Sequence, residues 1–176
     1  EYMFAFARSF NQSINNWNVS NVTNMNAMFN NTSFNQPLND WNVINVENME
    51  DMFNSANFNQ PINNWNVSNV TNMNGFFYRN KFFNQPLNSW DVSSVTDMGF
   101  MFHSAQSFNQ NINNWDVSNV TNMTCMFHSA KSFNQNINNW DVSNVEDMSN
   151  MFQEAKIFNQ PLDNWNISSV TNMTNM

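Results

Sequence analysis

Apolar residues return at the same places in every 24 or 25 residues of this chain. The clearest marker is a Phe-Asn-Gln phrase followed, seven residues after its Phe, by a Trp. The leading aromatic residues are Phe10, Phe34, Phe58, Phe83, Phe108, Phe133 and Phe158, and their partners are Trp17, Trp41, Trp65, Trp90, Trp115, Trp140 and Trp165. A fixed period of this length is typical of a solenoid, in which each repeat is too small to bury its own core and packs against its neighbours.

The repeat predicts a single array over residues 1–176 rather than several domains. Its units are 1–9 (partial), 10–33, 34–57, 58–82, 83–107, 108–132, 133–157 and 158–176 (partial). Both ends fall inside a repeat, since Met3-Phe4 matches Met28-Phe29. Because solenoids usually carry polar caps, we expect the sequence to be an excerpt of a longer protein or assembly. A missing signal peptide or membrane anchor then says nothing about location.

Within the unit 108–132, only Trp115 and Val117 alternate as in a strand. The pattern predicts a short strand at about Asn114 to Val117, with Asn114 and Asp116 facing outward. Stacked on its copies about 4.8 Å apart, this strand would form a parallel β-sheet along one face. The spacings of three and one between Val120, Met123, Met126 and Phe127 predict a tight turn and a 3₁₀ or short α segment. The predicted fold class is a right-handed repeat solenoid with a parallel sheet on one face and short 3₁₀ or irregular segments on the other.

An Asn follows every leading Phe, from Asn11 to Asn159. Backbone groups at the bends of a coil lose water when the next coil stacks on them. An amide side chain offers donors and an acceptor, so we expect these residues to form a hydrogen-bonded Asn ladder along the stack.

The unit resembles the repeats of BspA-like leucine-rich repeat surface proteins. The resemblance rests on Trp115-Asp116-Val117, Val120-Thr121, Met126-Phe127 and Ala130, and it covers the whole chain. It is closest to the variety with repeats of about 25 residues and the phrase Trp-Asp-Val-Ser-x-Val-x-x-Met, found in bacterial surface proteins and lipoproteins, including those of mycoplasmas. The resemblance implies a leucine-rich-repeat-like coil and a cell-surface or extracellular protein used in adhesion.

The charge balance narrows the choice of partners. With 13 acidic and 5 basic residues the chain carries a net charge of −8, which disfavours nucleic acid. All five basic residues lie between a Met-Phe pair and the next leading Phe: Arg8, Arg79, Lys81, Lys131 and Lys156. Most acids lie elsewhere, so we expect a mildly basic edge. This edge would either let arrays associate laterally or simply consist of solvated charges, and the latter is the simpler interpretation.

Residues that could carry chemistry are sparse. No catalytic triad, phosphate-binding glycine loop or zinc-ligand spacing is present, so no enzymatic activity and no cofactor are expected. His103 and His128 should be neighbours on adjacent coils and could share a metal ion. Their equivalents in other repeats are typical of an exposed site, which is the favoured interpretation: Asn30, Asn54, Tyr78 and Gln153. By the same comparison, the only cysteine, Cys125, is expected to be exposed.

Asp91, Asp116 and Asp141 follow Trp in three successive repeats and should form a row. Such a row is either a solvated face whose acidity limits aggregation or a weak Ca²⁺ site built from clustered oxygen ligands. Because no repeat supplies a second carboxylate beside them, the solvated face is the favoured interpretation.

The sequence supports two functional hypotheses. In the first, the chain is a non-enzymatic module for adhesion or protein–protein interaction, which binds a protein or cell-surface ligand through residues flanking each Trp. This interaction face comprises Asn16, Asn18, Asp40, Asn42, Asn64, Asn66, Ser89, Asp91, Asn114, Asp116, Asn139, Asp141, Asn164 and Asn166. In the second, it is a structural stalk or filament subunit that binds further copies of itself end to end or laterally. Neither hypothesis involves membrane insertion by this segment.

Overall fold

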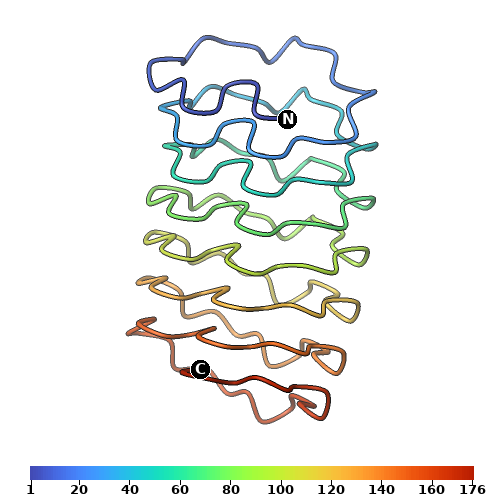
Figure 1. Cartoon of the computed structure of the whole chain (residues 1–176), viewed down its shortest axis with the longest axis vertical. Coiled ribbons are helices and arrows are strands. Elements are labelled where there is room, and N and C mark those ends of the chain that lie inside the picture. The colour runs from blue at the N-terminus through green and yellow to red at the C-terminus, as the bar shows by residue number, and fades with distance from the viewer.

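The chain winds into an elongated stack of coils (Figure 1). The computed structural model describes all 176 residues, with the N-terminal residues at one end of the stack and the C-terminal residues at the other. Hydrogen bonds join residues about one repeat apart, as in the bond from the Met123 amide to the Asp147 carbonyl at 2.9 Å. Each coil therefore meets the next coil in register.

The chain contains no helix and no strand longer than a single bridge residue. The bridges are parallel and connect Asn24, Asn48, Asn72, Asp97, Asn122, Asp147 and Asn172 in that order. The predicted fold class, a leucine-rich-repeat-like coil with a parallel β-sheet on one face, is therefore wrong. The bridges also lie elsewhere than expected, because Asn122 is five residues beyond the end of the strand predicted at Asn114 to Val117.

Tryptophans, and not strands, join the coils where the sheet was expected. Parallel indole rings of successive coils, such as Trp90 and Trp115, have centroids 6.4 Å apart. No backbone amide of residues 114–117 bonds the backbone of another coil, and the Trp115 indole N–H bonds the Leu87 carbonyl instead. Turn hydrogen bonds, from Trp115 to Ile112 and from Val120 to Val117, close the chain on either side instead.

The 3₁₀ or short α segment predicted after Val120 is also absent, and the backbone explains why. Two residues in this segment of the unit 108–132 have positive φ, Cys125 at 54° and Ser129 at 55°. A right-handed helix cannot continue through a left-handed residue. The segment is instead a run of turns, such as the one closed by the Met126 amide on the Met123 carbonyl.

This run of turns carries the main hydrogen bonds between coils. Amides of alternate residues donate to carbonyls of the following coil, and the intervening amides close turns within their own coil. In one coil the donors to the next coil are Met123, Cys125, Phe127 and Ser129, with N···O distances of 2.8 to 2.9 Å. The stack is thus joined along one arc by backbone bonds.

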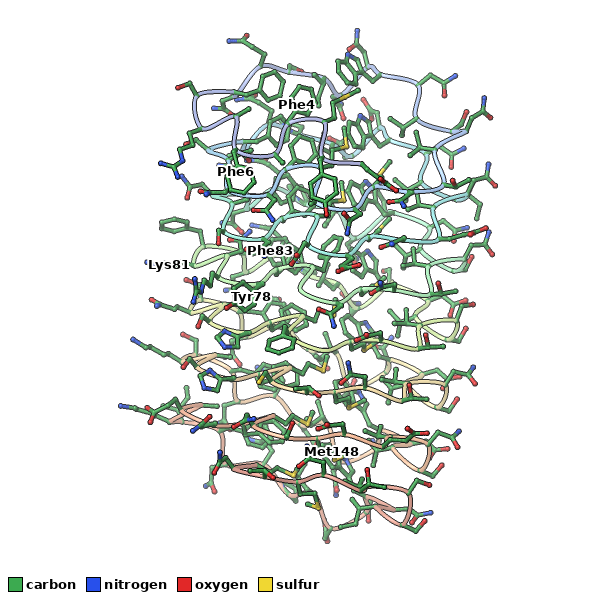
Figure 2. All side chains as sticks on the ribbon, viewed as in Figure 1. Phe4, Phe6, Tyr78, Lys81, Phe83 and Met148 are labelled. Carbon is green, nitrogen blue, oxygen red and sulfur yellow. The ribbon has the colours of Figure 1, made fainter.

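Aromatic columns fill the interior, as the side chains in Figure 2 show. Phe102 stacks on Phe77 and Phe127 of the neighbouring coils, with centroids 5.8 and 5.7 Å away. It also stacks on Phe108, the leading Phe of the next unit, at 4.0 Å. The buried apolar residues form one continuous cluster along the stack. Because each ring packs against rings of adjacent coils, no coil has a core of its own.

Candidate functional site

The residues flanking each Trp are exposed along the whole stack. Solvent reaches every member of the predicted interaction face: Asn16, Asn18, Asp40, Asn42, Asn64, Asn66, Ser89, Asp91, Asn114, Asp116, Asn139, Asp141, Asn164 and Asn166. Repetition from coil to coil places them in two rows, one before and one after the tryptophans. The rows lie on a turn-rich backbone and not on a β-sheet.

A rigid support lies beneath these rows. In the central coils Trp90 and Trp115 are each only 3% exposed. The Trp115 indole N–H donates to the Leu87 carbonyl of the preceding coil at 3.0 Å, and Trp90 bonds Ile62 in the same way. The indoles thus take the place of a backbone ladder on this side. They fix the height of each exposed pair of side chains.

The residue after each Trp also shapes the backbone. The Oδ1 atom of Asp116 accepts a hydrogen bond from the Ser118 amide at 3.0 Å. Asp91 accepts both the hydroxyl and the amide of Ser93, and these two bonds lower the pKa of its carboxyl group. Asn66 forms the same turn with Ser68. Asn and Asp are therefore interchangeable as turn acceptors here, and the choice between them sets only the surface charge.

The residue before each Trp links neighbouring coils in several places. Asn64 donates its amide to the Asn39 carbonyl at 2.7 Å, and Asn114 donates to Asn88 at 2.8 Å. The side chains of this row are therefore exposed to solvent, and some of them also hold neighbouring coils together.

Between two coils the face is hollowed. An open pocket of about 400 Å³ is lined by Asn63, Asn64, Trp65, Asn66, Val67, Ser68, Ser89 and Asp91. Four members of the predicted face, Asn64, Asn66, Ser89 and Asp91, thus converge on one hollow. Their side chains offer amide, hydroxyl and carboxylate groups at an edge of a buried indole.

A second polar hollow was not predicted from the sequence. It has a volume of about 490 Å³ and is lined only by Asn21, Thr23, Asn45, Glu47, Asn69 and Thr71. Glu47 is its only charged member and interrupts a column that is otherwise threonine at this end of the stack. Glu146 interrupts the same column but lines no hollow, so this substitution does not locate the hollow in the sequence.

The structure does not gather the candidate metal ligands into a cluster. No group of three His, Cys, Asp or Glu side chains lies close enough to hold a metal ion. Asp91, Asp116 and Asp141 each direct one carboxylate oxygen to the turn of their own coil. They remain a row of separate turn acceptors.

His103 and His128 do lie together. Their rings stack with centroids 4.4 Å apart and an interplanar angle of 17°, and Tyr78 continues the column at 4.7 Å. Burial, and next the neighbouring His128, lower the pKa of His103 from 6.5 to about 4. The Nδ1 atom of His128 is buried without a hydrogen-bond partner. The pair is an aromatic stack in which the neighbouring ring disfavours a proton on His103.

Cys125 is buried, so the prediction that it is exposed is wrong. It occupies a left-handed backbone position that also holds Asp51, Gly75 and Asn150. These three residue types favour positive φ for backbone reasons and do not indicate exposure.

The fold and the exposed rows define a repeat protein whose coils share one core and present one side-chain pattern many times. The chain belongs to the family described as "Mycoplasma protein of unknown function, DUF285", whose model matches residues 1–90, 54–130 and 77–176. Together the matches cover the entire chain, and the family is one of mycoplasma repeat proteins. A comparison with curated proteins found no match. The chain contains no helix long and apolar enough to cross a membrane.

Proposed function

We propose that this chain is a non-enzymatic binding module that contacts a protein or cell-surface ligand through the rows flanking its tryptophans. One observation carries the proposal: all fourteen flanking side chains are exposed, and four of them converge on a hollow of about 400 Å³. Repeat arrays bind extended ligands because they present equivalent groups at regular intervals. The buried indoles hold these groups in place before a ligand arrives, which lowers the entropy lost on binding.

The motif resemblance to BspA-like surface proteins supports a location at the cell surface or outside the cell, and a role in adhesion. A net charge of −8 disfavours nucleic acid as the partner. The carboxylates of Asp91, Asp116 and Asp141 would instead face basic or hydroxyl-rich groups on a protein or a cell surface.

Removing the carboxylate charges while keeping the turn geometry tests the rows that flank the tryptophans. In the variant Asp91→Asn/Asp116→Asn/Asp141→Asn, the turn acceptor is kept, because Asn66 performs the same role in its own coil. Adhesion of the purified chain to candidate host cells should fall several-fold, since the row loses its charge at unchanged geometry. A matched control, Glu47→Thr/Glu146→Thr/Glu154→Gln, removes three charges from other places and should adhere as the parent does.

A second variant, Asn66→Arg/Asp116→Arg, places bulky side chains over the face and should abolish adhesion. If both face variants adhere like the parent chain, the proposed face is rejected.

The uniformity of the surface favours one alternative, a stalk or filament subunit that binds further copies of itself laterally or end to end. Basic residues confined to one edge of an acidic chain would allow lateral contacts. Sedimentation velocity tests it. Concentration-dependent assembly that dissolves at about 1 M salt supports lateral electrostatic contacts, whereas a monomer at all concentrations rejects this alternative.

A further inference from the structure

One coil departs from the others at its edge. The unit 58–82 has Tyr78-Arg79-Asn80-Lys81-Phe82 where the next two units have His103-Ser104-Ala105-Gln106-Ser107 and His128-Ser129-Ala130-Lys131-Ser132. In a repeat protein the shared residues build the scaffold, and a local departure from the pattern calls for another explanation. Lys81 lies at the outer edge of the stack, while the neighbouring Phe83 points into the core (Figure 2).

A buried asparagine shapes this edge. Asn80 is fully buried at a position that holds Ala56, Ala105, Ala130 and Ala155 in other units. Its Nδ2 atom donates to the Phe58 carbonyl at 3.0 Å, and its Oδ1 atom accepts the amides of Phe82 and Phe83, each at 3.2 Å. The Ser107 hydroxyl also donates to the Lys81 carbonyl, at 2.7 Å. The backbone of Lys81 and Phe82 is thus held from two sides.

Beside this turn lies an open hollow of about 420 Å³, lined by Ser55, Ala56, Asn57, Arg79, Lys81 and Phe82. Two of its six residues are cations, in a chain with only five basic residues and a net charge of −8. Neither Arg79 nor Lys81 forms an ion pair. The single salt bridge of the structure joins Lys156 and Glu154. Arg79 lies over the Tyr78 ring, 5.0 Å from its centroid, which orients the guanidinium group.

Phe82 adds an apolar surface to these charges. Its side chain is 54% exposed, although the nearby Phe77 and Phe83 of the core columns are fully buried. Its counterparts in the next two units are Ser107 and Ser132, so the scaffold does not need an aromatic residue here.

We propose that the hollow formed by Arg79, Lys81 and Phe82 is a docking site for an acidic peptide segment of a partner protein. The partner's carboxylates bind the guanidinium of Arg79 and the ammonium of Lys81, and an apolar side chain next to them packs on Phe82. Arg79 supplies a forked donor that matches a carboxylate, and Lys81 supplies a second point charge.

The chemistry of the hollow favours a peptide over a polyanion such as heparin. Polyanions bind by neutralising many charges at once, and here two cations stand in a chain with an excess of acidic residues. A phosphate or sulfate polymer also makes no use of an exposed phenyl ring. A peptide that combines acidic and apolar residues matches both parts of the hollow.

This site is independent of the face proposed above, since it shares no residue with the rows flanking the tryptophans. A selection from random peptides tests it and needs no identified partner. Phage-displayed random peptides are selected on the immobilised chain, and the enriched peptides are measured by fluorescence anisotropy. We expect Asp or Glu beside a large apolar residue in the enriched sequences, and affinity that weakens as salt rises.

The matched variant converts this edge into that of its neighbours. Arg79→Ser, Lys81→Gln and Phe82→Ser introduce the residues found in the next unit, at Ser104, Gln106 and Ser107. Ser104 also has positive φ, as Arg79 does, so the backbone tolerates this exchange. The triple variant should retain the stability of the parent and bind the peptides at least about tenfold more weakly. The control Lys131→Gln removes a cation from another coil and should leave binding unchanged.

Three results would overturn the proposal. The first is enriched peptides without acidic residues, and the second is equal binding by the triple variant. The third is displacement of the bound peptide from the parent chain by heparin as effectively as by unlabelled peptide. That result would identify the hollow as a polyanion site.

Discussion

Asparagine occupies several distinct positions in each coil, and hydrogen bonding explains each of them. The Asn after each leading Phe forms a ladder, as expected from the sequence: the Asn109 carbonyl oxygen Oδ1 accepts the Asn134 amide at 3.0 Å. Other Asn residues accept the amide two residues ahead, as Asn122 does from Thr124. A third set donates to the preceding coil, as Asn119 does to Ser93. Each set satisfies backbone groups that the stack removes from water.

Removal of one ladder residue should therefore destabilise the stack. Asn109→Ala leaves the Asn134 amide without its acceptor, while the Gln135 side-chain amide keeps only its bond to the Asn109 backbone carbonyl. We expect a loss of about 1–3 kcal/mol in the free energy of unfolding, measured by urea denaturation. Asn88→Ala is the control, because the Asn88 side chain is exposed and only its backbone carbonyl is used, by Asn114. Equal stability of the two variants would contradict a structural role for the ladder.

At the scale of the element, the repeating unit of this fold is a run of turns. Left-handed residues recur four positions apart in each coil, as at Cys125 and Ser129, and they keep the run from becoming a helix. The same turns bring His103 and His128 into a stack at one edge. The imidazoles therefore acquire their unusual environment from the turn geometry.

The stack predicts a loss of stability in mild acid. Burial, followed by His128, lowers the pKa of His103 from 6.5 to about 4, so the folded chain resists a proton that the unfolded chain accepts. The contribution of neutral His103 to the free energy of unfolding should be fully present above about pH 6.5 and should decrease as the pH falls towards 4. Thermal unfolding across this range measures the effect.

His103→Gln is the matched variant, because Gln153 occupies the equivalent position in another unit. It should flatten the stability profile in this window. Asp91→Asn is the control and should leave the window unchanged, because hydrogen bonds lower the pKa of Asp91 from 3.8, below the range in question. An identical acid profile for His103→Gln would refute the role of the stack.

At the scale of the molecule, columns of aromatic residues join coils that share no regular secondary structure. Phe102 contacts one ring of the preceding unit, Phe77, and three rings of the following unit, which are Phe108, Trp115 and Phe127. The stability of such an array is a sum of neighbour interactions. A defect in one coil is consequently felt first by the coils on either side.

Phe102→Ala should cost about 3–5 kcal/mol, because it leaves a cavity between three coils. Hydrogen exchange should accelerate most in residues 77–132 and less at greater distance. Phe82→Ala is the control, since Phe82 is 54% exposed, and its cost should stay within about 0.5 kcal/mol. If both variants lose the same stability, or if protection falls uniformly along the chain, the neighbour description fails.

The sequence by itself determined which of the regularly repeated side chains lie inside the central coils and which lie outside. The period places equivalent residues above one another, so the Phe and Trp columns, the Asn ladder and the exposed flanking rows could all be predicted from one unit. This success has a local cause: the apolar or polar character of a residue decides its side of the coil.

The tertiary structure decided how the backbones meet. The alternation of Trp115 and Val117 suggested a strand, but a strand needs hydrogen-bond partners about one repeat away. At that point the indole N–H groups, and not the backbone amides, bond the neighbouring coil. The backbone hydrogen bonds between coils therefore lie in the turns around Asn122 and Cys125. There, residues with positive φ recur and alternate amides donate to the next coil. Two further features also depended on neighbouring coils: the burial of Cys125, and the hollow in which Arg79, Lys81 and Phe82 face residues of the coil before them.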